Sequence, residues 1–283
     1  MKSPDKLLFG TAGVPLSTED RNTVNGIAKV NELGLGCMEL EFVRQINITK
    51  DKAPEIKKQA EKFNVVLSCH APYYINLNAI EPEIMHASMQ RIEKSAEILN
   101  LCGGWSLCFH PGYYLNMDKD KVYETIKSRI QDIRKNLDNK DIDLWLRPET
   151  TGKATQFGDV DELLRISQEV EKVMPVFDFS HLHAREGKSN TEQEFTAILV
   201  KVEKYLGKEG LSNMHIHLSG IEYGQKGEKN HVNLQDSDLN YIGLAKVWKE
   251  FKVKGIVISE SPNIEEDALL LKKAYSKFLS HGI

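Results

Sequence analysis

The segment "MPVFDFSH", residues 174–181, decides the fold, because a run with the character of a buried strand ends in it abruptly at ionisable side chains. Residues 174–177 are apolar, and Asp178 and His181 follow at once. Seven other short apolar, β-prone runs occur along the chain, beginning at residues 7, 37, 65, 106, 144, 213 and 255. Segments with apolar residues three and four apart lie between them, at 82–100, 120–137 and 265–279. Strands therefore alternate with helices.

This alternation predicts the fold class and the domain organisation. Near-continuous apolar strands, each followed by a helix, are typical of a parallel sheet. Eight such units in 283 residues favour an α/β fold, a (β/α)8 TIM barrel that forms a single domain over residues 1–283. No GxGxxG or GxxxxGK[ST] motif follows a strand, which removes the simplest dinucleotide and nucleoside-triphosphate interpretations. The spacer 221–236 is a long, polar loop for a barrel, and such loops commonly serve the site.

Composition excludes several classes of protein. A formal net charge of −4 argues against a protein that coats nucleic acid by overall charge, so a polyanion would have to be bound locally. The four cysteines show no CxxC spacing and the first residues lack the apolar core of a signal peptide, so we expect a cytoplasmic protein with reduced thiols. No apolar run approaches the ~18 residues of a membrane span. We expect a monomer.

Ionisable residues recur where the predicted strands end. They are His70, His110, Glu149, Asp178 with His181, His215 with His217, and Glu260. In barrels these strand ends face a common mouth, where active sites are built. Carboxylates there without enough lysine and arginine to pair them would cost several kcal/mol each. A divalent cation removes that cost, and the mixture of imidazoles and carboxylates favours zinc, then manganese, cobalt or iron.

Each candidate also has a purely structural interpretation. A single histidine at a strand end is more often a hydrogen-bonded core residue than a ligand. Asp178 could instead cap a helix, since aspartate is a favoured N-cap residue. His215 and His217 share one face of their strand, so one could bind metal while the other lies deeper in the barrel. Glu39 and Glu41 also share a face, but a salt bridge with a lysine or arginine explains them equally well, and we do not include them in the site.

The motifs together resemble those of a known family. They are "CHAPYYINLN" (69–78), "FHPG" (109–112), "ETTG" (149–152), D-x-x-H (178–181) and "ESP" (260–262). In order and spacing they resemble endonuclease IV, the metal-dependent apurinic/apyrimidinic endonuclease, over nearly the whole chain. The resemblance implies three zinc ions. The first would be held by His70 and His110, and the second by Asp178, His217 and Glu260, with Glu149 bridging these two ions. The third would be held by His181 and His231.

Two positions depart from the family pattern. The family has an aspartate two residues before the late histidine of the third site, where this chain has Lys229. A charged lysine cannot bind a metal, so either Glu228 substitutes, or the loop is shifted, or the third ion is held weakly. We therefore expect two or three ions, zinc first and manganese as the alternative. The seventh strand ends in "HLSG" instead of H-x-N-D, which leaves the choice between His215 and His217 open.

The resemblance implies hydrolysis of the phosphodiester 5′ to an abasic site in duplex DNA, as in base excision repair. Glu260 would orient or deprotonate the nucleophile, and Glu149 would fix the distance between metals. Candidate contacts to the duplex are Arg44, Gln45, Tyr73, Arg185, Lys226 and Lys229. One alternative is a sugar isomerase or epimerase of the xylose isomerase-like group, toward which Lys229 leans. Another is a module that binds damaged DNA without cutting it.

Overall fold

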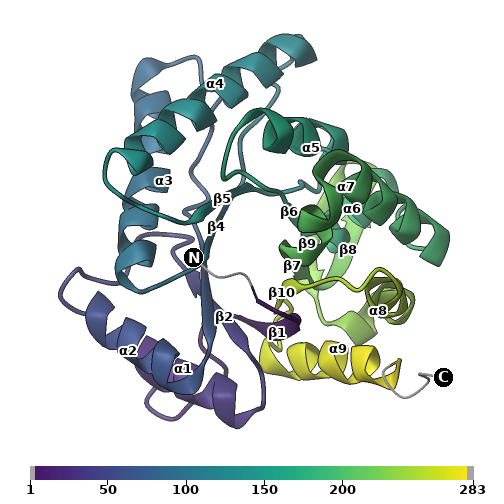
Figure 1. Ribbon diagram of the computed structural model, residues 1–283. Helices are drawn as coiled ribbons and strands as arrows, with labels where there is room; N and C mark the ends of the chain where they lie inside the picture. Colours follow the sequence, from purple (N-terminus) through teal and green to yellow (C-terminus); the bar gives the residue numbers. More distant parts are fainter. Residues whose placement is uncertain (1–3, 279–283) are drawn as a thin grey trace.

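Eight parallel strands form a nearly closed barrel in the computed structural model, which describes residues 4–278 (Figure 1). The strands are β1 (Leu7–Ala12), β2 (Cys37–Glu41), β3 (Val66–His70), β4 (Ser106–Phe109), β5 (Trp145–Pro148), β6 (Val176–Asp178), β7 (Met214–Leu218) and β10 (Gly255–Ser259). Their order is β5-β4-β3-β2-β1-β10-β7-β6. Isolated parallel bridges from Leu146 to Val173 and from Glu149 to Val176 bring the end strands β5 and β6 together. All eight predicted strands and the predicted TIM barrel are confirmed.

Helices surround the barrel (Figure 1). They are α1 (Thr23–Glu32), α2 (Ala53–Phe63), α3 (Pro82–Leu101), α4 (Lys119–Asp138), α5 (Val160–Glu169), α6 (Phe179–Glu186), α7 (Glu192–Ser212), α8 (Tyr241–Glu250) and α9 (Glu265–Lys277). The helices predicted at 82–100 and 120–137 are confirmed, and the one predicted at 265–279 is α9, with residue 279 outside the described residues. Within residues 4–278, none of these helices has the length and apolar character needed to cross a membrane.

The inside of the barrel changes from apolar to polar toward the mouth. On β5 and just beyond it, Trp145, Arg147 and Glu149 point inward in turn, because side chains alternate along a strand. The Arg147 guanidinium stacks 4.7 Å from the centre of the Trp105 ring and donates to Asn213 Oδ1 at 2.8 Å. This buried arginine and the tryptophans close the floor. Glu149 lies above them, at the mouth.

The passage from β6 to α6 fixes two candidate ligands. Asp178 ends the strand and caps the helix, and its Oδ1 accepts the backbone N–H of His181 at 2.7 Å. The helix ends at Gly187, whose φ of 62° is a left-handed conformation that glycine adopts without strain. Since no loop separates strand and helix, Asp178 and His181 both stay at the mouth.

The spacer 221–236, predicted to be a loop, is instead an ordered β-hairpin followed by a short 3₁₀ turn. Its strands are β8 (Gly220–Gly224) and β9 (Gly227–Val232), and the turn is η1 (Leu234–Asp236). The two strands pair antiparallel, from Gly220 opposite Val232 to Gly224 opposite Gly227. The hairpin follows β7 directly, so it stands at the mouth of the barrel beside α6 (Figure 1).

Candidate metal centre

Glu149 is the residue around which the predicted ligands gather. It is fully buried, and its two carboxylate oxygens face different histidines. Oε2 lies 2.9 Å from His110 Nε2 and 3.3 Å from His70 Nε2. Oε1 lies 2.9 Å from His217 Nδ1 and 3.7 Å from His181 Nδ1. A carboxylate placed in this way can serve two neighbouring cations at once.

Several overlapping sets of side chains could each hold a metal ion at the mouth. In each set the ligand atoms lie within 4.8 Å of one another, and the sets are His70, Cys108 and Glu149; His110, Glu149 and His181; Asp178, His181 and His231; and Glu149, Asp178, His217 and Glu260. The structure thus brings together all eight residues predicted as ligands. Cys108 was not predicted. Burial raises the pKa of its thiol well above the ordinary value, so the thiol stays protonated and donates to Glu149 Oε2 at 3.3 Å.

Three features of these side chains fit a metal. Asp178 caps α6 with Oδ1, but its buried Oδ2 has no hydrogen-bond partner, so the residue is both a helix cap and a free ligand. His70 Nδ1 lies 2.7 Å from the Ala71 carbonyl oxygen, and His181 Nδ1 lies 3.0 Å from that of Thr150. When these rings are neutral, the carbonyls hold the proton on Nδ1, so that Nε2 could bind a cation.

Without a cation, protons balance the charge of the cluster. Burial alone would raise the pKa of Glu149, but the imidazoles of His217 and His110 outweigh it and hold this pKa well below the usual range. Burial works against protonation of His70, yet the hydrogen bond and charge of Glu149 raise its pKa to about 10. The charges of Asp178 and Glu149 likewise raise the pKa of His181 to about 9 against the effect of burial. A divalent ion would replace these protons.

The third metal position contains the departure at Lys229. His231 Nε2 lies 3.4 Å from His181 Nε2, so the late histidine lies beside the other candidate ligand of this position. The Lys229 side chain turns away from these two histidines and places Nζ 3.6 Å from Glu222 Oε1. Glu228 faces the pair, with Oε2 3.6 Å from His181 Nε2 and Oε1 4.0 Å from His231 Nε2. Of the three alternatives left open by the sequence, this geometry favours substitution by Glu228.

Close backbone contacts hold Glu228 in this place. Its N–H donates to the Gly152 carbonyl at 3.0 Å, which ties β9 to the loop after β5. A Cβ on Gly152 would lie 2.6 Å from Glu228 Oε2, and a Cβ on Gly227 would lie 2.2 Å from the Gly152 carbonyl oxygen. Since real Cβ atoms do not come so near, both glycines are needed for the hairpin to dock on "ETTG".

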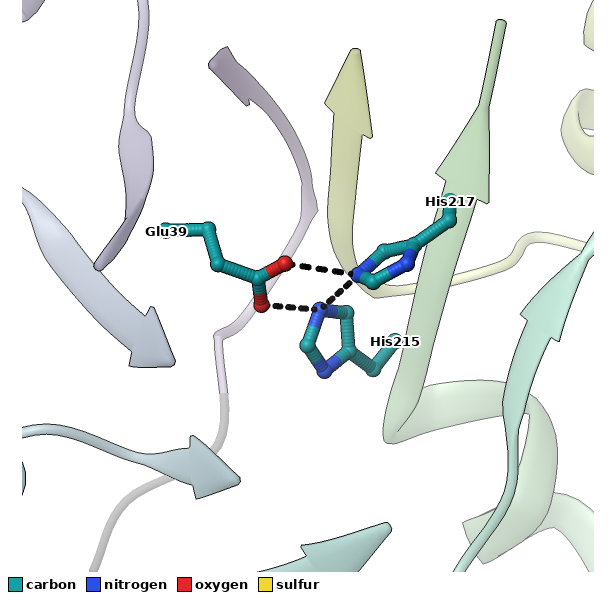
Figure 2. A group of neighbouring side chains, drawn as sticks. All are labelled: Glu39, His215 and His217. Carbon is teal, nitrogen blue, oxygen red and sulfur yellow. Dashed lines mark hydrogen bonds and ion pairs between the residues drawn. The ribbon is translucent and has the colours of Figure 1, made fainter. Parts of the chain in front are cut away.

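Beneath the centre lie two buried side chains that were not predicted as ligands, His215 and Glu39. His215 and His217 are both fully buried, and His217 is the one that faces the mouth, with Nδ1 3.3 Å from Glu260 Oε1. Glu39 contacts both histidines (Figure 2). Its partners are thus histidines and not the lysine or arginine of the structural alternative, because strand alternation predicts a shared face and not which strand lies opposite.

A polar cavity of about 390 Å³ opens above the centre. It is lined by His70, Tyr73, Ile75, His110, Gly112, Tyr113, Lys153, Gln156, His181, Glu228, Lys229, Asn230, His231 and Glu260. Tyr73 is 57% exposed and meets the His70 ring edge-on, with 5.5 Å between centroids. Lys153 and Lys229 supply positive charge at the cavity wall.

The remaining predicted DNA contacts lie outside this cavity. Arg44 and Gln45 are exposed just beyond β2, and Lys226 is exposed at the turn of the hairpin. Arg185 is engaged within the protein: it donates to the carbonyls of Thr151, Lys153 and Gln156 and to the Thr151 hydroxyl at 2.6–3.2 Å. Its guanidinium thus fastens the loop after β5.

Fold and site together define a (β/α)8 barrel whose mouth carries overlapping candidate metal-binding clusters. The family model described as "Xylose isomerase-like TIM barrel" matches residues 27–278. The chain belongs to this family.

Two relatives illustrate the range of similarity in sequence. The "Uncharacterized protein MJ0133" of Methanocaldococcus jannaschii is 48% identical over 272 residues, which cover 96% of this chain and 97% of that protein. The "Probable endonuclease 4" of Staphylococcus aureus is 26% identical over 239 residues, covering 82% and 77%. The resemblance to endonuclease IV seen in the motifs is therefore confirmed as a distant similarity along most of the chain.

Solved structures share the fold at lower identity. Endonuclease IV from Thermus thermophilus matches with a TM-score of 0.73 and 17% identity, covering 96% of this chain and all of that one. A D-tagatose 3-epimerase-like protein matches with a TM-score of 0.68 and 18% identity, covering 95% and 97%. At such identities the likeness establishes the barrel, which hosts both kinds of enzyme.

Proposed function

We propose that the protein is a metal-dependent apurinic/apyrimidinic endonuclease that hydrolyses the phosphodiester 5′ to an abasic site in duplex DNA, as in base excision repair. The observation that carries this proposal is the position of Glu149, whose two oxygens face separate histidines. A single ion would need one set of ligands, whereas the overlapping sets suit two or three ions. Zinc is favoured by the many imidazoles, with manganese as the alternative.

The residues of the site would divide the work of hydrolysis. When bound, the ions would supply a nucleophile near neutral pH and offset the charge of the phosphodiester. Glu149, whose two oxygens face separate histidines, would hold two neighbouring ions. Glu260 stands at the cavity wall, where it orients the attacking water and takes up its proton. Burial raises the pKa of Glu260 well above the ordinary value, and a bound cation would oppose this by favouring the carboxylate, which is the form that accepts a proton.

The cavity and its rim suit a damaged strand. An abasic nucleotide costs less to extrude from the duplex than one with a paired base, so a pocket that accepts the bare sugar selects the lesion. Lys153 and Lys229 line this pocket and would attract the phosphate. The exposed ring of Tyr73 can stack on a neighbouring base. Arg44 and Lys226, exposed at the same end of the barrel, are proposed to contact the flanking backbone.

Incision of a duplex oligonucleotide carrying one tetrahydrofuran abasic analogue tests the proposal, with metal content measured on the same sample. We expect a cut 5′ to the lesion that leaves a 3′-hydroxyl, and no cut in E260Q. E266Q is the matched control, since Glu266 carries the same substitution on the exposed side of α9. A metal-loaded protein that leaves the oligonucleotide intact would refute the proposal.

A sugar epimerase is the second candidate, because Glu149, Asp178, His217 and Glu260 alone complete one four-ligand site for a single ion. Barrel relatives in structure include an epimerase-like protein. In that case His70, His110, His181 and His231 would be surplus ligands around the cavity. Assaying the same metal-loaded sample with ketohexoses separates the two: turnover of sugar without incision of DNA would favour the epimerase.

A further inference from the structure

Below the candidate metal centre, three fully buried side chains face one another inside the barrel: Glu39 from β2, and His215 and His217 from β7 (Figure 2). Glu39 Oε1 lies 2.9 Å from His217 Nε2, and Oε2 lies 3.3 Å from His215 Nε2. The two Nε2 atoms are 3.2 Å apart. One carboxylate thus meets two imidazoles where no solvent can reach it.

We propose that Glu39 is a positioning residue for the metal ligand His217. Its carboxylate accepts the Nε2 proton of His217 and so leaves Nδ1 unprotonated, directed at the mouth. There Nδ1 lies 2.9 Å from Glu149 Oε1 and 3.3 Å from Glu260 Oε1, the place of a shared cation. The inference rests on the proposed function only in that His217 binds a metal.

The other histidines of the centre show why His217 needs such a partner. The second nitrogen of His70 and of His181 faces a backbone carbonyl. His217 lies within β7, which pairs with β6 on one side and with β10 on the other. Its Nε2 points across the barrel, where Glu39 Oε1 lies at 2.9 Å and His215 Nε2 at 3.2 Å. Of these two neighbours, the carboxylate is the stronger acceptor for the proton. A carboxylate also makes imidazole a more basic ligand than a carbonyl does.

His215 completes the arrangement. Its Nε2 faces the second oxygen of Glu39, while its Nδ1 lies 2.9 Å from the Ser106 hydroxyl. The serine can donate to Nδ1, which leaves the proton of His215 on Nε2 for the carboxylate. Glu39 then accepts one proton on each oxygen, so its orientation is fixed from both sides. His215 acts on the metal centre through Glu39 and not as a ligand.

A different arrangement has the opposite protonation of His217. If the three side chains of Figure 2 held an ion of their own, Nε2 of His217 would be the ligand and the proton would move to Nδ1. The position of this proton therefore separates a positioning carboxylate from a second metal site deeper in the barrel.

The first measurement is zinc affinity, by competition with a chromophoric chelator, for wild type, E39A, E39Q and E41Q. Loss of a carboxylate behind a histidine ligand typically weakens metal binding about 10–100-fold, which we expect for E39A. E39Q keeps a carbonyl acceptor and should lose less. E41Q is the matched control, since Glu41 is the same residue type two positions along the same strand, and it should lose less than E39Q. Circular dichroism checks that each variant folds, and E39Q keeps the test open should E39A not fold.

The second measurement is the protonation of His217, by long-range ¹H–¹⁵N correlation spectra of zinc-loaded protein labelled on histidine and assigned with H215Q. A protonated Nε2 and a metal-shifted Nδ1 are expected. A proton on Nδ1, or equal zinc affinity in wild type and E39A, would overturn the inference while leaving the metal centre intact. A wild type that binds no zinc would refute the metal centre itself and this inference with it.

Discussion

The unfolding free energy of the metal-free protein should fall as the pH rises from 6.5 to 9, because protons on the histidines balance the buried carboxylates when no metal is bound. Burial disfavours a charged His70, but Glu149 raises its pKa to about 10, against about 6.5 in an unfolded chain. A raised pKa means that the folded state binds the proton more tightly. The stabilisation is therefore complete below pH 6.5 and disappears as the pH rises through 10.

The magnitude follows from the shift. Each pKa unit corresponds to about 1.4 kcal/mol, so His70 alone should account for about 3 kcal/mol of lost unfolding free energy between pH 6.5 and 9. His181, with a pKa raised to about 9, acts in the same direction. Because both imidazoles face Glu149, their contributions will not simply add.

Urea unfolding followed by circular dichroism, in the presence of a chelator, measures this loss at several pH values. H70Q cannot titrate at this position and should show a decrease that is smaller by about 3 kcal/mol. Zinc-loaded protein should show a much flatter profile, since the ions and not the protons then balance Glu149. Equal pH dependence in metal-free wild type and H70Q would refute the reasoning.

Three further predictions concern the hairpin, the rim and the loop after β5. E228Q should weaken zinc binding at the third metal position at least about tenfold and lower the zinc content measured by mass spectrometry, whereas K229A should leave that content unchanged. The reverse result would show that Lys229 and not Glu228 supports zinc at this position. Y73A should cost about 1–3 kcal/mol of affinity for abasic duplex through lost stacking, measured by fluorescence anisotropy, and unchanged affinity would place the ring outside the interface. R185M should destabilise the protein by about 2 kcal/mol or more, because buried carbonyls lose their donor, yet leave the salt dependence of DNA binding unchanged; a slope lower by about 1 would instead identify Arg185 as a phosphate contact.

The barrel could be predicted because its signals are local. Each buried strand carries its own apolar run, and the change to ionisable residues marks its carboxyl end, as "MPVFDFSH" shows at β6. Parallel strands bring those ends to one mouth, so the clustering of His70, Glu149 and Asp178 follows from their place in successive units. No long-range contact had to be known.

Glu39 could not be placed in the same way. Alternation along β2 shows that Glu39 and Glu41 face one side, but the partner of Glu39 comes from β7, on the far side of β1 and β10 in the sheet. Whether such a carboxylate meets a lysine or an imidazole depends on how the barrel closes across its interior. A charged residue within an apolar strand indicates strongly that it has a partner, but it says little about which residue the partner is.

The hairpin shows why counting residues from the family motif misleads at the third metal position. In a regular strand Glu228 and His231, three residues apart, would point to opposite faces. However, Glu222 and Tyr223 are adjacent on β8 and pair with Asn230 and Glu228, so Lys229 is an extra residue in β9, a β-bulge. The bulge shifts the alternation by one, which puts the Glu228 carboxylate on the face of His231 and turns Lys229 toward Glu222. A lysine at the expected aspartate position is thus compatible with a complete ligand set, because the bulge turns this residue away from His181 and His231.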